Sequence, residues 1–275
     1  MIKNQQFMKS KQMKKQYLIL FFIFLNFSNL GYSQNYLEYI KKVNKYQARA
    51  KLKKHKQYKI FQIYRSSNDI RYYIDKNTFN IDEYIKMFNL LKFKDSTKNC
   101  CFYCFYVYDY EDGGYPRIIV KEKDIDYQNK VDKFNDGKRE KDFYYITDKS
   151  SPECSFIPED SYMGYLQYLY FEKVCDKFLL KYSALYEKKY VITSKYEAKK
   201  IIRKDFIGSD YEKQNKAQKA NNFDFTPKIR FTDDGHCEIE WIEMQKLGIY
   251  RCKYKISRTD FNIKQTNKEM LLKKF

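Results

Sequence analysis

The sequence contains little histidine, glycine and proline, and these shortages exclude several familiar kinds of active site. Only two histidines occur in 275 residues, so a metal centre built from several imidazoles is excluded. The eight glycines form neither the phosphate-binding loop of nucleotide-binding proteins nor the Gly-x-Ser-x-Gly turn of serine hydrolases. The four prolines mark loops and no linker. We therefore expect no cofactor and no catalytic motif of these kinds.

The seven cysteines match neither a disulfide framework nor a zinc site. Cys101 and Cys104 have the CxxC spacing of redox and zinc sites, but they lie in the strand-like run CCFYCFYVYDY. Residues three apart on a strand face opposite sides of the sheet. An odd number of cysteines also leaves at least one thiol unpaired within a monomer. We expect at most two disulfides, with Cys100 or Cys101 as candidates for a bond to a remote partner.

Residues 1–33 have the three-part pattern of a signal peptide. Residues 1–16 contain five lysines and no acidic residue, and the apolar run Tyr17–Leu30 follows them. This run is shorter than the roughly 20 apolar residues that span a bilayer. Small residues follow at Gly31 and Ser33. This order places a signal-peptidase cleavage between Ser33 and Gln34.

We therefore expect an exported protein, either periplasmic or extracellular, whose mature chain has no transmembrane span. The sequence offers two start sites for translation, Met1 and Met13, and Met13 begins a more ordinary signal peptide. The alternative is that the segment stays uncleaved and anchors the N-terminus in a membrane.

The chain carries a large positive charge. The formal net charge is +19, and the five lysines of the leader account for 5 of it, which leaves +14 for the mature chain. Such a surplus attracts polyanions and anionic surfaces. Only nine of the 54 basic residues are arginines, however, and nucleic-acid recognition usually relies on the arginine fork. An anionic ligand or an envelope component is therefore a better expected partner than nucleic acid.

The first half of the mature chain, residues 34–150, is expected to mix helices and strands. Asn80 followed by Asp82 and Glu83 is typical of a capped helix start. The nearly continuous apolar run at 100–110 predicts a central strand, and the following EDGG predicts a hairpin turn. The expected helices are 35–54 and 80–92, and the expected strands are 57–65, 70–74, 100–110, 115–123 and 141–147.

The second half, residues 160–275, is expected to contain a helix pair followed by antiparallel strands. Ser194 and Glu197 match the capping box of a helix start. The first helix is expected at 161–188, and the strands at 227–232, 236–244, 249–257 and 261–266. The pattern indicates an α+β fold. The second half could form a curved sheet that cradles the long helix, as cystatin-like and nuclear-transport-factor-like rolls do. The two halves, separated near 150–160, could also form one continuous domain.

Alternation of side chains gives the last hairpin a register. With QKLG as the loop, the acidic residues of one strand face basic residues of the next, and core residues face each other. The predicted pairs are Glu238–Lys255, Glu240–Lys253, Trp241–Cys252 and Cys237–Ile256. In this register Cys237 and Cys252 are too far apart to bridge, so we expect two buried thiols. The two acid–base pairs are expected to form cross-strand ion pairs.

The candidates for a catalytic role are His236 and Asp233, and the turn chemistry of Asp-Asp-Gly is the alternative explanation for this acidic segment. His236 and Cys237 are neighbours on a strand and point to opposite faces, so they cannot act as a catalytic pair. His55 lies among lysines and is expected at the solvated surface.

The leading interpretation is a non-enzymatic binding or interaction protein of the cell envelope, with an aromatic and basic surface. The tyrosines of 103–110 could stack on a ligand, although strand packing explains them as well. One alternative is a hydrolase of unfamiliar type that uses scattered carboxylates and His236. Another alternative is a lysine-rich polyanion-binding module.

Overall fold

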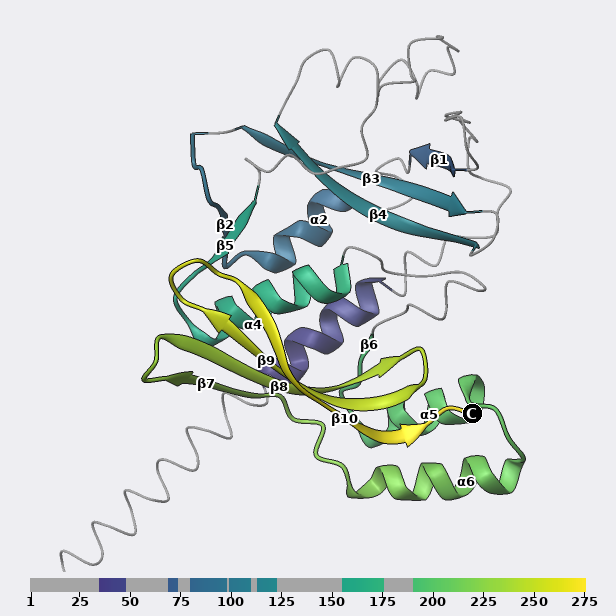
Figure 1. Cartoon of the computed structure of the whole chain (residues 1–275). Helices are drawn as coiled ribbons and strands as arrows, with labels where there is room; N and C mark the ends of the chain where they lie inside the picture. Colours follow the sequence, from purple (N-terminus) through teal and green to yellow (C-terminus); the bar gives the residue numbers. More distant parts are fainter. Residues whose placement is uncertain are drawn as a thin grey trace, which may run out of the picture.

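The fold is α+β, as the sequence predicts, with antiparallel sheets and helices in separate layers. Figure 1 shows the computed structural model of the protein. The residues that the structure describes are 35–47, 69–73, 80–97, 99–109, 113–122, 155–175 and 190–275. The expected signal peptide and the strands expected at 57–65 and 141–147 lie outside them. Residues 48–54 and 176–188 of the expected helices 35–54 and 161–188 also lie outside them. None of the described helices is long and apolar enough to cross a bilayer.

A three-stranded antiparallel sheet is built around the aromatic run. It contains β1 (Asp69–Tyr73), β3 (Cys100–Asp109) and β4 (Gly113–Glu122), in the order β1-β3-β4. The prediction of a central strand followed by a hairpin is therefore confirmed. Continuous apolar character suits a central strand because both of its edges are paired and its faces can be covered.

The predicted helix at 80–92 begins as expected but ends early. Asn80 caps α2 (Ile81–Ile85) by accepting a hydrogen bond from the backbone N–H of Glu83, at 3.1 Å. A 3-10 turn, Lys86–Phe88, follows, and then the chain forms β2 (Leu91–Phe93). The expectation of helix up to Lys92 is wrong because β2 pairs with β5 (Phe156–Pro158), a segment more than 60 residues away in sequence. This pairing replaces the helical hydrogen bonds, so long-range contacts overrule the local pattern.

A layer of helices lies between the two larger sheets (Figure 1). It includes α2 and α4 (Tyr162–Tyr170), which Ser161 caps, together with the predicted opening helix at residues 35–47. Every residue of α4 from Gly164 to Tyr170 is buried, so the helix is covered on all sides rather than along one stripe. A π-helical segment, Phe171–Cys175, continues it.

A five-stranded antiparallel sheet occupies the C-terminal part. Its strands are β6 (Tyr190–Val191), β7 (Lys228–Thr232), β8 (His236–Gln245), β9 (Gly248–Ser257) and β10 (Ile263–Lys273). Their order is β10-β9-β8-β6, and β7 also pairs with β8. The last strand is longer than the predicted 261–266 and contains two register shifts. β8 and β9 leave a two-residue loop, shorter than the four residues expected.

The outer face of this sheet is covered at the end that carries the β8–β9 turn. Two helices lie there, α5 (Lys195–Asp205) and α6 (Asp210–Lys219), and they form a second core with Ile242 and Met244. Ser194 caps α5 as predicted, by accepting the N–H of Glu197 at 3.2 Å. α6 was not predicted from the sequence, although its Ser209–Glu212 pair is a complete capping box.

The predicted register of the β8–β9 hairpin is confirmed. The paired residues include Glu238–Lys255, Glu240–Lys253, Trp241–Cys252 and Cys237–Ile256. Cys237 and Cys252 are free and fully buried, as expected.

The two ion pairs predicted for this hairpin, Glu238–Lys255 and Glu240–Lys253, do not form. Glu238 contacts Lys253 at 3.0 Å, and Glu240 contacts Arg251 at 3.8 Å. Both contacts are diagonal, because each glutamate contacts the basic residue two positions before the one that it faces. Strand twist brings diagonal neighbours within reach of long side chains. Lys255, which faces Glu238, instead contacts Asp234.

The principal core combines residues from both sides of the expected boundary near 150–160. Ile40, Tyr84 and Ile118 from the first half belong to the same buried cluster as Leu166 and Trp241 from the second. The division into 34–150 and 160–275 stays a prediction, and so does the likeness to a curved-sheet roll.

Candidate ligand-binding site

A cavity of about 390 Å³ lies beside the small sheet of β2 and β5. Its volume is within the range of small-molecule sites, and like them it is lined mainly by apolar side chains. We call it the phenylalanine pocket. Its lining residues are Ile85, Phe88, Leu91, Lys92, Phe93, Ser96, Phe102, Phe156 and Phe171.

Pairing of β2 with β5 places the central rings of the pocket. Phe93 and Phe156 face each other across the two strands, and their rings stack with centroids 4.8 Å apart. Phe102 comes from β3 and stacks on Phe156 at 5.8 Å with an interplanar angle of 10°. All three side chains are half-buried. The stack therefore presents part of its aromatic surface to the cavity while the rings hold one another in place.

The opposite part of the wall comes from the helices. Phe171, the first residue of the π-helical segment, meets Phe156 edge-on at 5.1 Å. Phe88, in the 3-10 turn, meets Phe171 edge-on at 5.3 Å. π-Helical segments occur frequently at functional sites. Here the π-helical segment begins at Phe171, whose ring contacts both Phe156 and Phe88.

A buried glutamine fixes the turn that leads into the pocket. Gln167 of α4 is 2% exposed, and its side-chain oxygen accepts the N–H of Leu90 at 3.0 Å. Its amide nitrogen donates to the Asn89 side chain at 3.2 Å. The Asn89–Leu90 turn is thus bonded directly to the central helix layer. A preformed wall of this kind reduces the entropy lost when a ligand binds.

The pocket has one charged lining residue, Lys92, and one hydroxyl, Ser96. Both are exposed, in contrast to the half-buried rings. A lysine head group stays in water while its aliphatic stem can cover apolar surface. The arrangement therefore suits a ligand with an apolar or aromatic body and an anionic group near the solvent.

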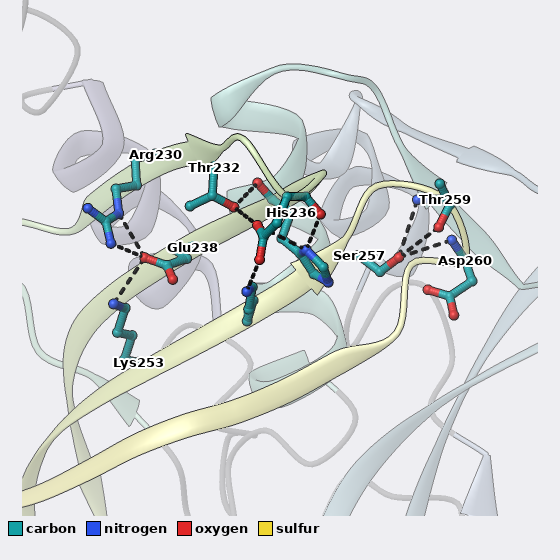
Figure 2. A network of polar contacts seen from close by, with 10 residues as sticks. Arg230, Thr232, His236, Glu238, Lys253, Ser257, Thr259 and Asp260 are labelled. Atoms are coloured by element: carbon teal, nitrogen blue, oxygen red, sulfur yellow. Dashed lines mark hydrogen bonds and ion pairs between the residues drawn. The ribbon is translucent and has the colours of Figure 1, made fainter.

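The catalytic candidates lie elsewhere, at the turn between β7 and β8 (Figure 2). Nδ1 of His236 is 2.8 Å from the backbone oxygen of Asp234 and 3.2 Å from its carboxylate. Asp233 is exposed and is not the acid that contacts the histidine. The structure thus joins His236 to Asp234 rather than to Asp233.

The carboxylate of Asp234 is already satisfied by its neighbours. Hydrogen bonds from Lys255 and from the hydroxyl of Thr232 hold the pKa of Asp234 well below its usual range. Ser257 lies opposite His236 on β9, but its hydroxyl contacts Thr259 at 3.0 Å. The polar groups of this turn are therefore hydrogen-bonded to one another.

A buried carboxyl group was not anticipated from the sequence. Glu243 of β8 is 0% exposed and accepts the indole N–H of Trp241 at 2.6 Å. The hydroxyl of Tyr254 lies 3.3 Å from both of its oxygens, and Gln245 also donates to it. Because Glu243 is enclosed, it holds the core together but cannot reach a substrate in this conformation.

The two described thiols of the five-stranded sheet, Cys237 and Cys252, show no sign of a reactive site. Burial raises the pKa of the Cys237 thiol and of the Cys252 thiol to about 12, so neither forms a thiolate near neutral pH. Cys100 is disulfide-bonded. Cys101 and Cys104 lie within strand β3, and no group of His, Cys, Asp or Glu suited to a metal occurs among the described residues.

Comparisons with protein-family models, with curated proteins and with solved structures find no match to this chain. Its function is therefore argued from the geometry of its own residues. The five phenylalanines of the pocket lie on five separate segments with no regular spacing. The general aromatic richness of the chain was the only sequence signal for them, and it pointed to the tyrosines of 103–110 instead.

Proposed function

We propose that this protein is an exported, non-enzymatic binding protein that holds an apolar or aromatic ligand in the phenylalanine pocket. Lys92 at the edge of the pocket pairs with an anionic group of that ligand. The observation that carries the proposal is the continuous wall of five aromatic rings around a cavity of about 390 Å³. Sites of this size and lining usually bind small molecules, with a few polar groups that set orientation.

Two fluorescent probes test the pocket and its charge separately. 1-Anilinonaphthalene-8-sulfonate has an aromatic body and a sulfonate, whereas N-phenyl-1-naphthylamine has the same rings without the charge. Both are expected to bind the wild-type chain. Lys92→Gln should weaken the sulfonate probe by about two- to five-fold, the usual worth of an exposed ion pair, and leave the neutral probe unchanged. Lys94→Gln is the matched control on the same segment.

A pocket-filling variant, Leu91→Trp, should reduce the binding of both probes by at least ten-fold. Its urea midpoint should be measured with its binding, so that loss of the fold is recognised. Undiminished binding of both probes to Leu91→Trp would show that they bind elsewhere and would refute the proposal.

Export rests on the N-terminal sequence, and the disulfide at Cys100 supports it, since disulfides persist mainly in oxidising compartments. Mass spectrometry of the chain recovered from a bacterial host should find a periplasmic or secreted protein that begins at Gln34. An intact chain that stays in the cytosol would contradict export. An intact chain in the membrane fraction would support the uncleaved anchor instead.

A hydrolase is the second candidate, because the contact between Asp234 and His236 resembles a base held by its orienting acid. It predicts turnover on an ester, glycoside or phosphodiester panel that His236→Ala abolishes at unchanged melting temperature. Polyanion binding is supported less, since Arg230, Arg251 and Lys253 on the outer sheet face already contact acids. It predicts affinity that falls steeply with salt.

A further inference from the structure

One side of α5 carries basic residues in pairs that lie one helical turn apart. Lys199 and Lys200 form the first pair, Arg203 and Lys204 form the second, and Tyr196 lies one turn before them. Residues three and four apart are neighbours on a helix surface, so these five side chains share one face. We call it the α5 basic face. Tyr196 is 77% exposed, the other side chains are exposed, and only that of Lys199 is partly covered.

The opposite side of α5 is packed, which turns the basic face outward. Ala198 and Ile202 are fully buried in the second core, together with Ile242 of β8. α5 thus rests on the outer face of the five-stranded sheet, beside α6 (Figure 1). A helix that buries only one side presents a convex surface to the solvent on the other.

The charges of this face are not neutralised within the part of the chain that the structure describes. None of the four cations, Lys199, Lys200, Arg203 and Lys204, forms an ion pair there. The basic residues of the outer sheet face differ, since they contact acids. Like charges four residues apart on a helix, as in Lys199–Arg203 and Lys200–Lys204, are mildly destabilising. An anionic partner would remove this repulsion.

The acids of the two helices lie at the helix ends. Glu197 accepts the backbone N–H and the hydroxyl of Thr193 at 2.7 and 2.9 Å, so its carboxylate points toward the start of α5. Asp205 is the last residue of α5 and is partly buried. Asp210 and Glu212 lie in the first turn of α6. The middle of the α5 basic face therefore presents positive charge around an exposed aromatic ring.

We propose that the α5 basic face docks peripherally on an anionic lipid surface. Lysine and arginine side chains contact anionic head groups, and tyrosine rings favour the level of the head groups. A linear polyanion fits less well, because such chains are usually bound along a basic groove and this face is convex. A second copy of the chain also fits less well, since a two-fold contact would oppose the cations of one copy to those of the other. The chemistry is independent of the phenylalanine pocket.

A site-specific probe in the full chain tests this docking. The tryptophan introduced by Tyr196→Trp is compared with one introduced by Tyr162→Trp, at an exposed tyrosine of α4. Tyr162 stacks on Phe231, which pairs with the start of β8, whereas α5 packs on the end of β8. The native Trp241 is buried and contributes the same background to both variants. With vesicles of equal parts phosphatidylcholine and phosphatidylglycerol, brominated acyl chains should quench the first variant and not the second. Pure phosphatidylcholine vesicles should quench both much less.

The cations are tested by two quadruple variants of the same total charge. Lys199→Gln, Lys200→Gln, Arg203→Gln and Lys204→Gln together should weaken binding to the anionic vesicles by about 600-fold, at about five-fold for each cation. The control replaces four exposed lysines of other elements and should weaken binding far less: Lys42→Gln, Lys45→Gln, Lys86→Gln and Lys264→Gln. Urea midpoints show whether both variants keep the fold, and the N-terminal segment is common to all variants. The quenching test needs none of these substitutions, so it decides the proposal even where a quadruple variant unfolds.

Three results would overturn the proposal. One is a Tyr196→Trp variant that anionic vesicles quench no more than the Tyr162→Trp variant. Another is an equal loss of vesicle binding in both quadruple variants, which would indicate only a general effect of net charge. The third is unchanged vesicle binding by the α5 quadruple variant together with weaker binding to heparin, a soluble linear polyanion, which would assign the face to polyanions instead.

Discussion

The buried carboxyl group of Glu243 should stabilise the fold, and replacing it tests this prediction. It accepts from the indole of Trp241 and from Gln245, and the hydroxyl of Tyr254 lies within reach of both oxygens. Glu243→Leu removes the acceptor and leaves the buried donors of Trp241 and Tyr254 without it. An unsatisfied buried donor costs about 1–3 kcal/mol, so we expect a loss of about 2–6 kcal/mol for these two groups. Glu243→Gln keeps one acceptor oxygen and should lose less.

The decisive comparison is Tyr254→Phe in two backgrounds. In the wild type it removes a hydrogen bond and should cost about 0.5–1.5 kcal/mol. In the Glu243→Leu background it removes a stranded hydroxyl and should recover about 1–3 kcal/mol. Urea unfolding, followed by the fluorescence of the single tryptophan, Trp241, gives the stability of the wild type, of both single variants and of the double variant. A loss of stability of similar size in both backgrounds would refute the assigned network.

Three further predictions concern the same sheet. Gly248→Ala should destabilise the fold by more than about 1 kcal/mol in urea unfolding, because a Cβ there would lie 1.9 Å from a carbonyl oxygen of β10; a neutral effect would contradict this close approach. Stability should fall as pH rises from about 9 to about 12, because the pKa of Cys237 is about 12 in the folded chain and ordinary in the unfolded chain, so the unfolded state loses the proton first. Cys237→Ala should make the slope of stability against pH shallower by about one proton, and an unchanged slope would argue against the raised pKa of Cys237. A double-mutant cycle should give about 0.5–1 kcal/mol for Glu238 with Lys253, which are 3.0 Å apart, and less for the directly facing Glu238 and Lys255.

Features that depend on neighbouring residues could be predicted from the sequence. Asn80, Ser161 and Ser194 each begin a helix at the expected place, because a cap needs only a short side chain and the N–H three residues on. The register of Trp241 with Cys252 followed from alternation and a short turn, because a slip of one residue would turn the whole core face outward.

The ion pairs and β2 show where such reasoning stops. Facing positions were correct, but the contacts of Glu238 and Glu240 depend on strand twist and on basic residues of neighbouring strands. Leu91–Phe93 continues a helical pattern and yet forms a strand, because a partner at 156–158 satisfies its backbone. The identity of that partner is not encoded near residue 91.

The candidate site is the part that only the tertiary structure decided. Sequence alone determined the α+β class, most element starts, the hairpin register and the buried thiols, because these follow from local periodicity and side-chain chemistry. The phenylalanine pocket needs Phe88, Phe93, Phe102, Phe156 and Phe171 to meet from five segments. Such surfaces arise from long-range packing, whose partners no spacing along the chain reveals.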